Sequence, residues 1–214
     1  MSAPDPCDGR IRGIHVIAKG GRGFVAIGAV ATLAAIPFSL FATVGLLALT
    51  LFLAIVFRDT GRTIGDGVVA PADGTVREVD QEKGYVSTYL ALRNVHVTRS
   101  PIDGIVRKRQ RQHGKHAPAF SSKTVHNERL EIQLGTRLGD VSIVQMTGAI
   151  ARRIVPYVHE GQSLGKGEKL GLIRFGSRVD VFMPPSSVRI TVKKGDKLRA
   201  GVSRIAEVLN DRVE

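Results

Sequence analysis

Residues 169–184, with the sequence KLGLIRFGSRVDVFMP, decide the fold of the domain around them. They predict two strands, 170–174 and 179–182, joined in a hairpin at Phe175-Gly176-Ser177. Apolar and polar residues alternate along the second run, as in a strand with one buried face. A Gly-Ser pair between two such runs is usually no more than a turn. The residues alone support only that interpretation.

The rest of residues 66–214 continues the pattern of short alternating runs, bounded by Gly, Pro, Asp and Asn at intervals of about eight to twelve residues. Besides the two runs above, the predicted strands are 68–69, 75–79, 85–90, 96–98, 104–109, 130–134, 141–146, 188–192 and 203–208. A helix is predicted at 148–157. This order indicates a mainly β (α+β) domain of the sandwich or barrel type, and not a βαβ alternation.

A long apolar run precedes this domain and follows a basic N-terminal segment, residues 1–23. Residues 24–57 contain no charged side chain, and the run is longer than the apolar region of a signal peptide, which has about 7–15 residues. As one straight helix it would be roughly 50 Å long, against a hydrocarbon core of ~30 Å. The run therefore predicts a helical membrane anchor.

Two geometries are open for this anchor. One is a single tilted span of about 20–25 residues, and the other is a hairpin of two short helices bent near Ile36-Pro37 or at 42–45. Basic residues flank the run on both sides, Lys19 and Arg22 before it and Arg58 and Arg62 after it. Because basic flanks stay on the cytoplasmic side, the hairpin is favoured, with both ends on the cytoplasmic face of the cell membrane.

The chain is strongly basic, with 31 Lys and Arg against 19 Asp and Glu and a formal net charge of +12. Such an excess favours an anionic partner. Aromatic residues are 5% of the chain and Trp is absent, so a base-stacking surface for nucleic acid is not expected. The basic segment 107–115 is predicted to be a loop that is either solvated or in contact with anionic lipid headgroups. Cys7 is the only cysteine, which excludes an internal disulfide or a Cys-rich zinc site, and no metal is expected.

Four segments carry a more specific signal when they are taken in order. They are Ala70-Pro71-Ala72-Asp73-Gly74, Asn94-Val95-His96-Val97-Thr98-Arg99-Ser100-Pro101, Asn127-Glu128-Arg129 and Arg174-Phe175-Gly176-Ser177-Arg178-Val179-Asp180. Each segment alone is common. Together with an apolar run that ends in Phe57-Arg58-Asp59, they resemble the short-form phosphatidylserine decarboxylases, including the archaeal archaetidylserine decarboxylases. The resemblance covers residues 55–208.

This resemblance implies an enzyme that processes itself. Members of the family cleave their own Gly-Ser bond, which maps onto Gly176 and Ser177. The Ser177 side chain then becomes a covalent pyruvoyl group at the start of a small subunit, residues 177–214, and residues 1–176 remain as the membrane-bound large subunit. Residues 58–214 would form the decarboxylase domain, and no external cofactor is added.

The resemblance also implies roles for individual residues. A serine hydroxyl needs an adjacent base to act as a nucleophile, and the family's Asp–His–Ser set maps onto Asp73, His96 and Ser177. In the second reaction the amine of a serine phospholipid forms a Schiff base with the pyruvoyl ketone, CO2 leaves, and the electrons pass into this sink. His96 is the candidate that returns a proton. The product is the ethanolamine phospholipid.

The sequence leaves the roles of several residues and the class of lipid open. Arg99 stands where other members carry a second His, so the base and acid roles both fall on His96 or Arg99 only holds the lipid phosphate. Arg152 and Arg153 are further candidates for phosphate binding. The sequence does not distinguish a diacyl lipid from its ether-linked counterpart.

Two other functions are compatible with the residues. A membrane-anchored serine hydrolase of the Ser-His-Asp type would keep the chain intact and react with acylating reagents. A membrane-tethered module of the biotinyl or lipoyl type would need a lysine at an exposed hairpin tip. Self-cleavage into two fragments separates the decarboxylase from both.

Overall fold

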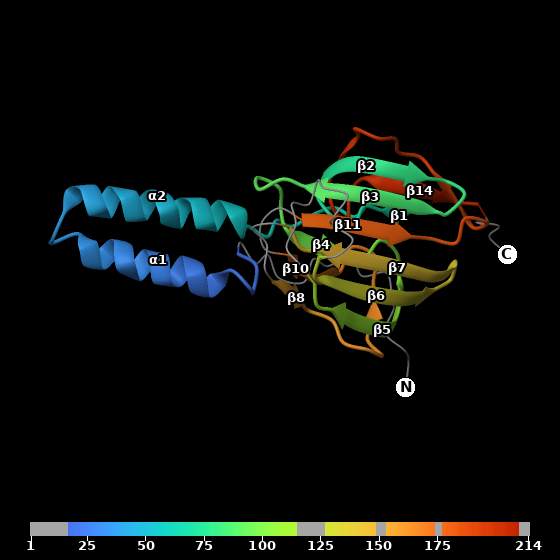
Figure 1. The fold of residues 1–214 in the computed structure, drawn as a ribbon, viewed down its shortest axis with the longest axis horizontal. Coiled ribbons are helices and arrows are strands. Elements are labelled where there is room, and N and C mark those ends of the chain that lie inside the picture. Colours follow the sequence, from blue (N-terminus) through green and yellow to red (C-terminus); the bar gives the residue numbers. More distant parts are fainter. Residues whose placement is uncertain (1–16, 115–126, 149–152, 174–176, 210–214) are drawn as a thin grey trace.

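A β domain with a long helical hairpin projecting from one end makes up the protein (Figure 1). The structure is a computed structural model, and it describes residues 17–114, 127–148, 153–173 and 177–209. Within this part of the chain, the strands form an eight-stranded sheet in the order β13-β2-β3-β11-β7-β6-β5-β9 and two three-stranded sheets, β1-β14-β12 and β4-β10-β8. The predicted mainly β class is confirmed.

The strands have the following bounds: β1 Val68–Val69, β2 Gly74–Asp80, β3 Tyr85–Leu90, β4 Val97–Arg99, β5 Gly104–Gln112, β6 Arg129–Thr136, β7 Gly139–Met146, β8 Ile154–Pro156, β9 Ser163–Leu164, β10 Lys169–Ile173, β11 Ser177–Phe182, β12 Val188–Ile190, β13 Lys197–Leu198 and β14 Arg204–Val208. All of their pairings are antiparallel.

Two local predictions are wrong. The helix predicted at 148–157 is contradicted by β8, which pairs with β10. Pro156 has no amide hydrogen to donate, which suits an edge strand such as β8. Residues 149–152 lie outside the described residues. The basic segment predicted as a loop is largely strand β5, which pairs with β6 and β9. Its charged side chains are accommodated because most of β5 is exposed.

The opening stretch does form two strands, but they do not form a hairpin. β10 lies between β4 and β8, whereas β11 lies between β3 and β7 in the large sheet. Both edges of β10 and both edges of β11 are therefore occupied by other strands, so β10 and β11 cannot pair with each other. The chain passes from one sheet to another between Ile173 and Ser177, and Gly176 lies outside the described residues.

The main core is shared by all three sheets. Buried residues come from the large sheet (Ile143, Val179), from the β4-β10-β8 sheet (Leu170) and from the β1-β14-β12 sheet (Ile205), and each of them is fully buried. Val179 is the second residue after Ser177 on the same face of β11. The residues of this face are therefore fixed in a packed interior.

The apolar run forms two antiparallel helices, α1 Arg22–Ala35 and α2 Leu40–Val56. The chain turns between them near Pro37, and the Ser39 hydroxyl caps α2 by accepting a hydrogen bond from the Ala42 amide. Thr32 and Thr50 are joined by their hydroxyls at 3.3 Å across the pair. The run is thus bent as in the hairpin geometry. Neither helix is long and apolar enough to cross a membrane.

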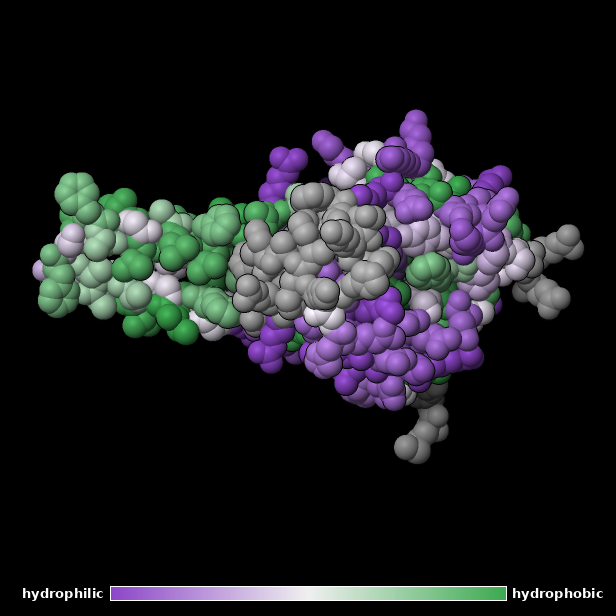
Figure 2. Space-filling model, in the orientation of Figure 1, coloured by the Kyte–Doolittle hydropathy of each residue, from purple (hydrophilic) through white to green (hydrophobic). Residues whose placement is uncertain are grey.

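Large apolar side chains cover the outside of this hairpin, as Figure 2 shows along its whole length. The most exposed lie at the turn, where Phe38 is 87% and Phe41 is 90% exposed. A contiguous apolar surface of this kind is unusual for a protein surrounded by water.

The base of the hairpin belongs to the β domain. Phe57 is 2% exposed and packs in a second core with Ala18, Val95, Val97 and Leu172. A Cβ atom at Gly21 would lie 2.3 Å from the Phe57 ring, so the chain entering α1 has room only for glycine there. Val97 and Leu172 belong to β4 and β10, the strands next to the family motifs.

We expect Phe57→Ala to lower the free energy of unfolding by about 3–5 kcal/mol, because a fully buried aromatic side chain leaves a cavity. Phe41→Ala, the same change at the exposed turn, should shift it by no more than about 0.5 kcal/mol. Urea denaturation in detergent measures both. Equal effects of the two substitutions would contradict the assignment of Phe57 to the core.

Candidate active site

Ser177 is the first residue of β11 and is completely buried. Its hydroxyl has no hydrogen-bond partner among the described residues. A buried hydroxyl without a partner costs about 1–3 kcal/mol, and such groups in folded proteins call for an explanation. The hydroxyl is therefore held in the interior without any of the contacts that would occupy its lone pairs or its proton.

His96 lies directly before β4 and is also buried, at 1% exposure. Its Nδ1 is 2.7 Å from the Asn94 carbonyl oxygen. A carbonyl only accepts hydrogen bonds, so Nδ1 carries the proton and Nε2 carries the lone pair. The His96 carbonyl accepts from the amide of Ile173 at 3.1 Å. This bond places His96 beside the end of β10, where the chain leaves for Ser177.

Burial lowers the pKa of His96 from 6.5 to about 4. The positive charge of Arg58 contributes to this lowering of the pKa, while the bond to Asn94 and the negative charge of Asp73 partly oppose it. At neutral pH the imidazole is therefore uncharged. A neutral imidazole with a lone pair on Nε2 is the form that accepts a proton from a hydroxyl.

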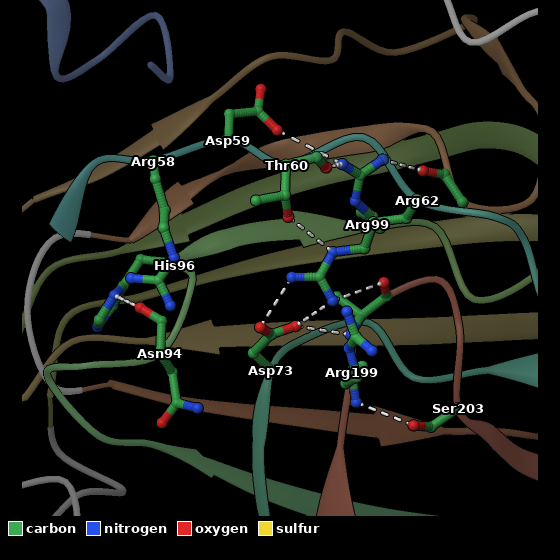
Figure 3. A network of polar contacts seen from close by, with 12 residues as sticks. Arg58, Asp59, Thr60, Arg62, Asp73, Asn94, His96, Arg99, Arg199 and Ser203 are labelled. Carbon is green, nitrogen blue, oxygen red and sulfur yellow. Dashed lines mark hydrogen bonds and ion pairs between the residues drawn. The ribbon is translucent and has the colours of Figure 1, made fainter. Parts of the chain in front are cut away.

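Asp73 lies at the corner that leads into β2 and is held by other groups than His96. Its carboxylate forms an ion pair with Arg62, with both N–O distances at 2.8 Å, and accepts from the Ala200 amide at 2.7 Å. Figure 3 shows these contacts around Asp73 and the separate bond between His96 and Asn94. The group that fixes the tautomer of His96 is thus a main-chain carbonyl, while Asp73 acts on the imidazole through its charge.

Arg99, at the end of β4, has its guanidinium engaged inside the protein. It donates to the carbonyls of Gly167 at 2.9 Å and Thr60 at 3.0 Å, and it contacts the Asp59 carboxylate at 3.4 Å. Asp59 is also paired with Lys169. These contacts tie the segment that follows α2 to β4 and β10.

The remaining predicted site residues are either outside the described part of the chain or exposed. Gly176 and Arg152 lie outside the described residues, and Arg153 is exposed. The structure thus brings Ser177 and His96 to neighbouring chain segments, with Asp73 near enough to influence the charge of His96, and engages Arg99 elsewhere.

Several site residues are missed by reasoning from the sequence. Asn94 acts through its carbonyl, which residue type does not reveal. Arg58 is noticed only as a flank of the apolar run, although it lies beside His96 and bonds the carbonyls of Ile55 and Arg93. The sequence does contain a signal for Gln145, because this polar residue occupies a buried position of the alternating strand β7.

Comparison with known proteins identifies the family of this chain. Residues 49–206 match the family model of phosphatidylserine decarboxylase. The chain belongs to the phosphatidylserine decarboxylase family. It is 43% identical over 169 residues to a protein of Methanosarcina acetivorans named as an archaetidylserine decarboxylase proenzyme, covering 78% of this chain and 80% of that one. It is 44% identical over 153 residues to a phosphatidylserine decarboxylase proenzyme of Streptomyces griseus, covering 70% and 71% of the two chains.

This phosphatidylserine decarboxylase match confirms the resemblance carried by the four motifs. The matched region begins inside α2 and ends in β14, so it contains Asp73, His96 and Ser177. Family membership makes the chain a carboxy-lyase of phospholipid biosynthesis. Neither the serine hydrolase nor the biotinyl-like module finds support among these relatives.

The low pKa of His96 predicts a specific dependence of stability on pH. The unfolded chain binds a proton at His96 below about pH 6.5, whereas the folded chain does so only near pH 4. Folding is therefore destabilised as the pH falls through this window, by about 3 kcal/mol in all. Chemical denaturation of a Ser177→Ala chain at pH 7 and pH 5 should show about 2 kcal/mol of this loss.

His96→Gln in the same background should remove this part of the pH dependence, since an amide does not titrate. His159→Gln, at an exposed histidine, is the matched control and should leave the dependence unchanged. Parallel curves for the His96→Gln chain and its parent would contradict a neutral buried imidazole.

Proposed function

We propose that this chain is the precursor of a membrane-attached, pyruvoyl-dependent decarboxylase of serine phospholipids. The observation that carries the proposal is the buried Ser177 hydroxyl, which has no partner among the described residues, together with a buried, neutral His96 in a member of this family. Relatives named as proenzymes act on phosphatidylserine or archaetidylserine by name. The substrate proposed here is a phosphoserine lipid with either diacyl or ether-linked chains.

In the proposed self-cleavage, the Ser177 Oγ attacks the carbonyl carbon of Gly176 and His96 Nε2 takes the hydroxyl proton. The C–N bond to Ser177 breaks, an ester to Oγ forms, and the proton passes to the released nitrogen. Removal of the Ser177 α-proton then expels the Gly176 carboxylate. Tautomerisation and addition of one water molecule release ammonia and leave the ketone of the pyruvoyl group.

The position of Ser177 fits a covalent pyruvoyl group. A hydroxyl without partners in a closed interior is free to be converted without breaking an existing hydrogen bond. When formed, the group supplies a ketone that binds the substrate amine and takes up the electrons released with CO2. His96 is the proposed proton donor to the product carbon, and Asp73 supports its protonated form through charge.

The two fragments, 1–176 and 177–214, would stay together as a heterodimer. The smaller one contributes β11, which pairs with β3 and β7 along its length. It also contributes β13 to the large sheet and both β12 and β14 to a smaller one. The backbone bonds and shared core that hold these strands do not depend on the bond before Ser177.

Binding of the lipid phosphate needs a cation near His96. The guanidinium of Arg99 is engaged with Asp59 and two carbonyls, so it is the weakest of the predicted candidates. Arg152 and Arg153 remain candidates. Arg58 joins them, because it is half-buried beside His96 at the end of the apolar hairpin and, among the described residues, its side chain bonds only main-chain carbonyls.

The helical hairpin is the proposed membrane attachment. Its exposed apolar side chains would be buried in one leaflet, with the turn at Pro37 deepest and Arg58 at the headgroup level on the cytoplasmic face (Figure 2). Such an arrangement would place His96 and Ser177 close to the lipid headgroups. Residues 24–57 would be the anchor and 58–214 the self-processing domain.

Ser177→Ala should yield one intact, inactive chain, since the variant lacks the nucleophile and the precursor of the ketone. The wild type should give two bands on a denaturing gel, the smaller containing residues 177–214, and should lose activity with hydroxylamine. Ser187→Ala, a partly buried serine that donates to the Leu138 carbonyl, is the matched control and should be cleaved normally. An intact wild-type chain with full decarboxylase activity would refute the proposal.

Replacing residues 25–54 by a short flexible linker should release the protein from phospholipid vesicles while self-cleavage continues. The ends of the deleted segment are close, because the rings of Phe24 and Phe57 stack with centroids 5.8 Å apart, and Phe57 is retained. Co-sedimentation with vesicles of the full chain and the shortened chain measures the effect. Equal binding of both would show that the β domain, and not the hairpin, holds the membrane.

A further inference from the structure

Two buried polar atoms on the inner face of the large sheet have no hydrogen-bond partner in the part of the chain that the structure describes. One is the Ser177 hydroxyl and the other is the side-chain carbonyl oxygen, Oε1, of Gln145, and both residues are fully buried. A third unpartnered atom, in Ser87, belongs to a residue opposite Asp180 and hence to the other face. Among the described residues, the inner face therefore holds one hydroxyl and one amide oxygen that form no hydrogen bond.

The orientation of the Gln145 amide follows from its neighbour. The Thr98 hydroxyl donates its one proton to the Gly171 carbonyl at 3.2 Å and must accept from Gln145, at 2.9 Å. Gln145 therefore presents its NH2 group to Thr98. In this orientation Oε1 has no partner among the described residues.

The strand register places this acceptor near Ser177. Gln145 lies directly opposite Val179 in the β7–β11 pair, and Ser177 is two residues before Val179 on the same face. Diagonal neighbours of this kind have Cβ atoms about 7–8 Å apart, which a long side chain can bridge. Thr98 also lies two residues after His96, so both point to the same side of their extended segment.

Self-cleavage creates a need for such an acceptor. When the acyl group moves to the hydroxyl, the nitrogen of residue 177 becomes a free amino group in a buried place. A buried amino group without partners is costly, and an acceptor oxygen within reach offsets that cost. A neutral amide oxygen accepts from the amino group without adding a charge.

We propose that Gln145 is a positioning residue that accepts, through Oε1, a hydrogen bond from the released nitrogen of residue 177. This inference rests on the proposed self-cleavage and adds a function for Gln145 within it. The bond holds the ester intermediate so that its α-proton faces the base. Thr98 fixes the amide that makes this contact.

The ester intermediate has two fates. Loss of the α-proton and of the Gly176 carboxylate, followed by hydrolysis, gives the pyruvoyl group and ammonia. Attack of water on the ester instead gives the same carboxylate and an unmodified serine at position 177. The two small fragments differ in mass by one ammonia molecule, so their ratio reports how well the nitrogen is held.

Gln145→Met fills the same volume without the acceptor. We expect cleavage to slow about tenfold, as for loss of one hydrogen bond to a charged or partly charged group, and a large share of the fragment 177–214 to begin with serine. The wild-type fragment should begin with pyruvoyl throughout. Intact-mass spectrometry of the purified full-length protein measures both, together with its melting temperature.

Gln133→Met is the matched control. Gln133 lies on the adjacent strand β6, where its amide bonds to Asp140 at the surface, and its variant should give only the pyruvoyl fragment. Gln145→Glu keeps acceptor oxygens at the site and should restore the pyruvoyl fragment. A Gln145→Glu chain that is stably folded yet gives serine-ended or no fragment would overturn the proposal.

A cleaved Gln145→Met chain that carries only pyruvoyl would also overturn it, because Gln145 would then act on the hydroxyl or on packing alone. If the Met variant does not fold, the Glu variant decides by itself. Failure of the wild type to cleave would instead overturn the self-cleavage proposal. The two failures are thus distinguishable in one set of spectra.

Discussion

The structure depends on one constraint: two strands that follow each other in the chain are each enclosed by other strands. β10 is held by β4 and β8, and β11 is held by β3 and β7. The chain must therefore cross between sheets just before Ser177. The main chain at Ser177 is fixed by the pairing of β11, and its side chain is enclosed by the packed core. This gives the hydroxyl a defined place without a hydrogen bond of its own.

The same strands connect the site to the helical hairpin. Phe57 packs on residues of β4 and β10, and Asp59 pairs with Arg99 and Lys169 of these two strands. Arg58, between them, lies beside His96 and affects its pKa. Residues 57–59 thus follow the hairpin directly in the sequence, and they also contact the strands and side chains of the site. Figure 3 shows the polar part of this set of contacts, in which Arg58 and Asp59 lie near His96 and Arg99.

Much of this could be predicted from the sequence, where a local pattern determines a local structure. The strands at 85–90 and 141–146 follow from alternation, and the two helices follow from an uncharged run with a proline near its middle. Pairing partners are not local, so the stretch around Ser177 was expected to be a hairpin. Contacts through main-chain atoms are equally hidden, as the carbonyl of Asn94 shows. Asp73 was expected to act with His96 and Ser177, but its direct partners are Arg62, from the segment between α2 and β1, and the Ala200 amide, just after β13.

If the chain is cut before Ser177 as proposed, the placement of the last strands has a consequence for the cut protein. Residues 177–214 supply the interior strand β11 and the edge strand β13 to one sheet, and β12 and β14 to another. Exchange of this piece between two molecules would require both sheets to open at once, together with the core between them. Each molecule therefore keeps the piece with which it was synthesised, and a preparation that contains both active and inactive copies will not mix them by subunit exchange.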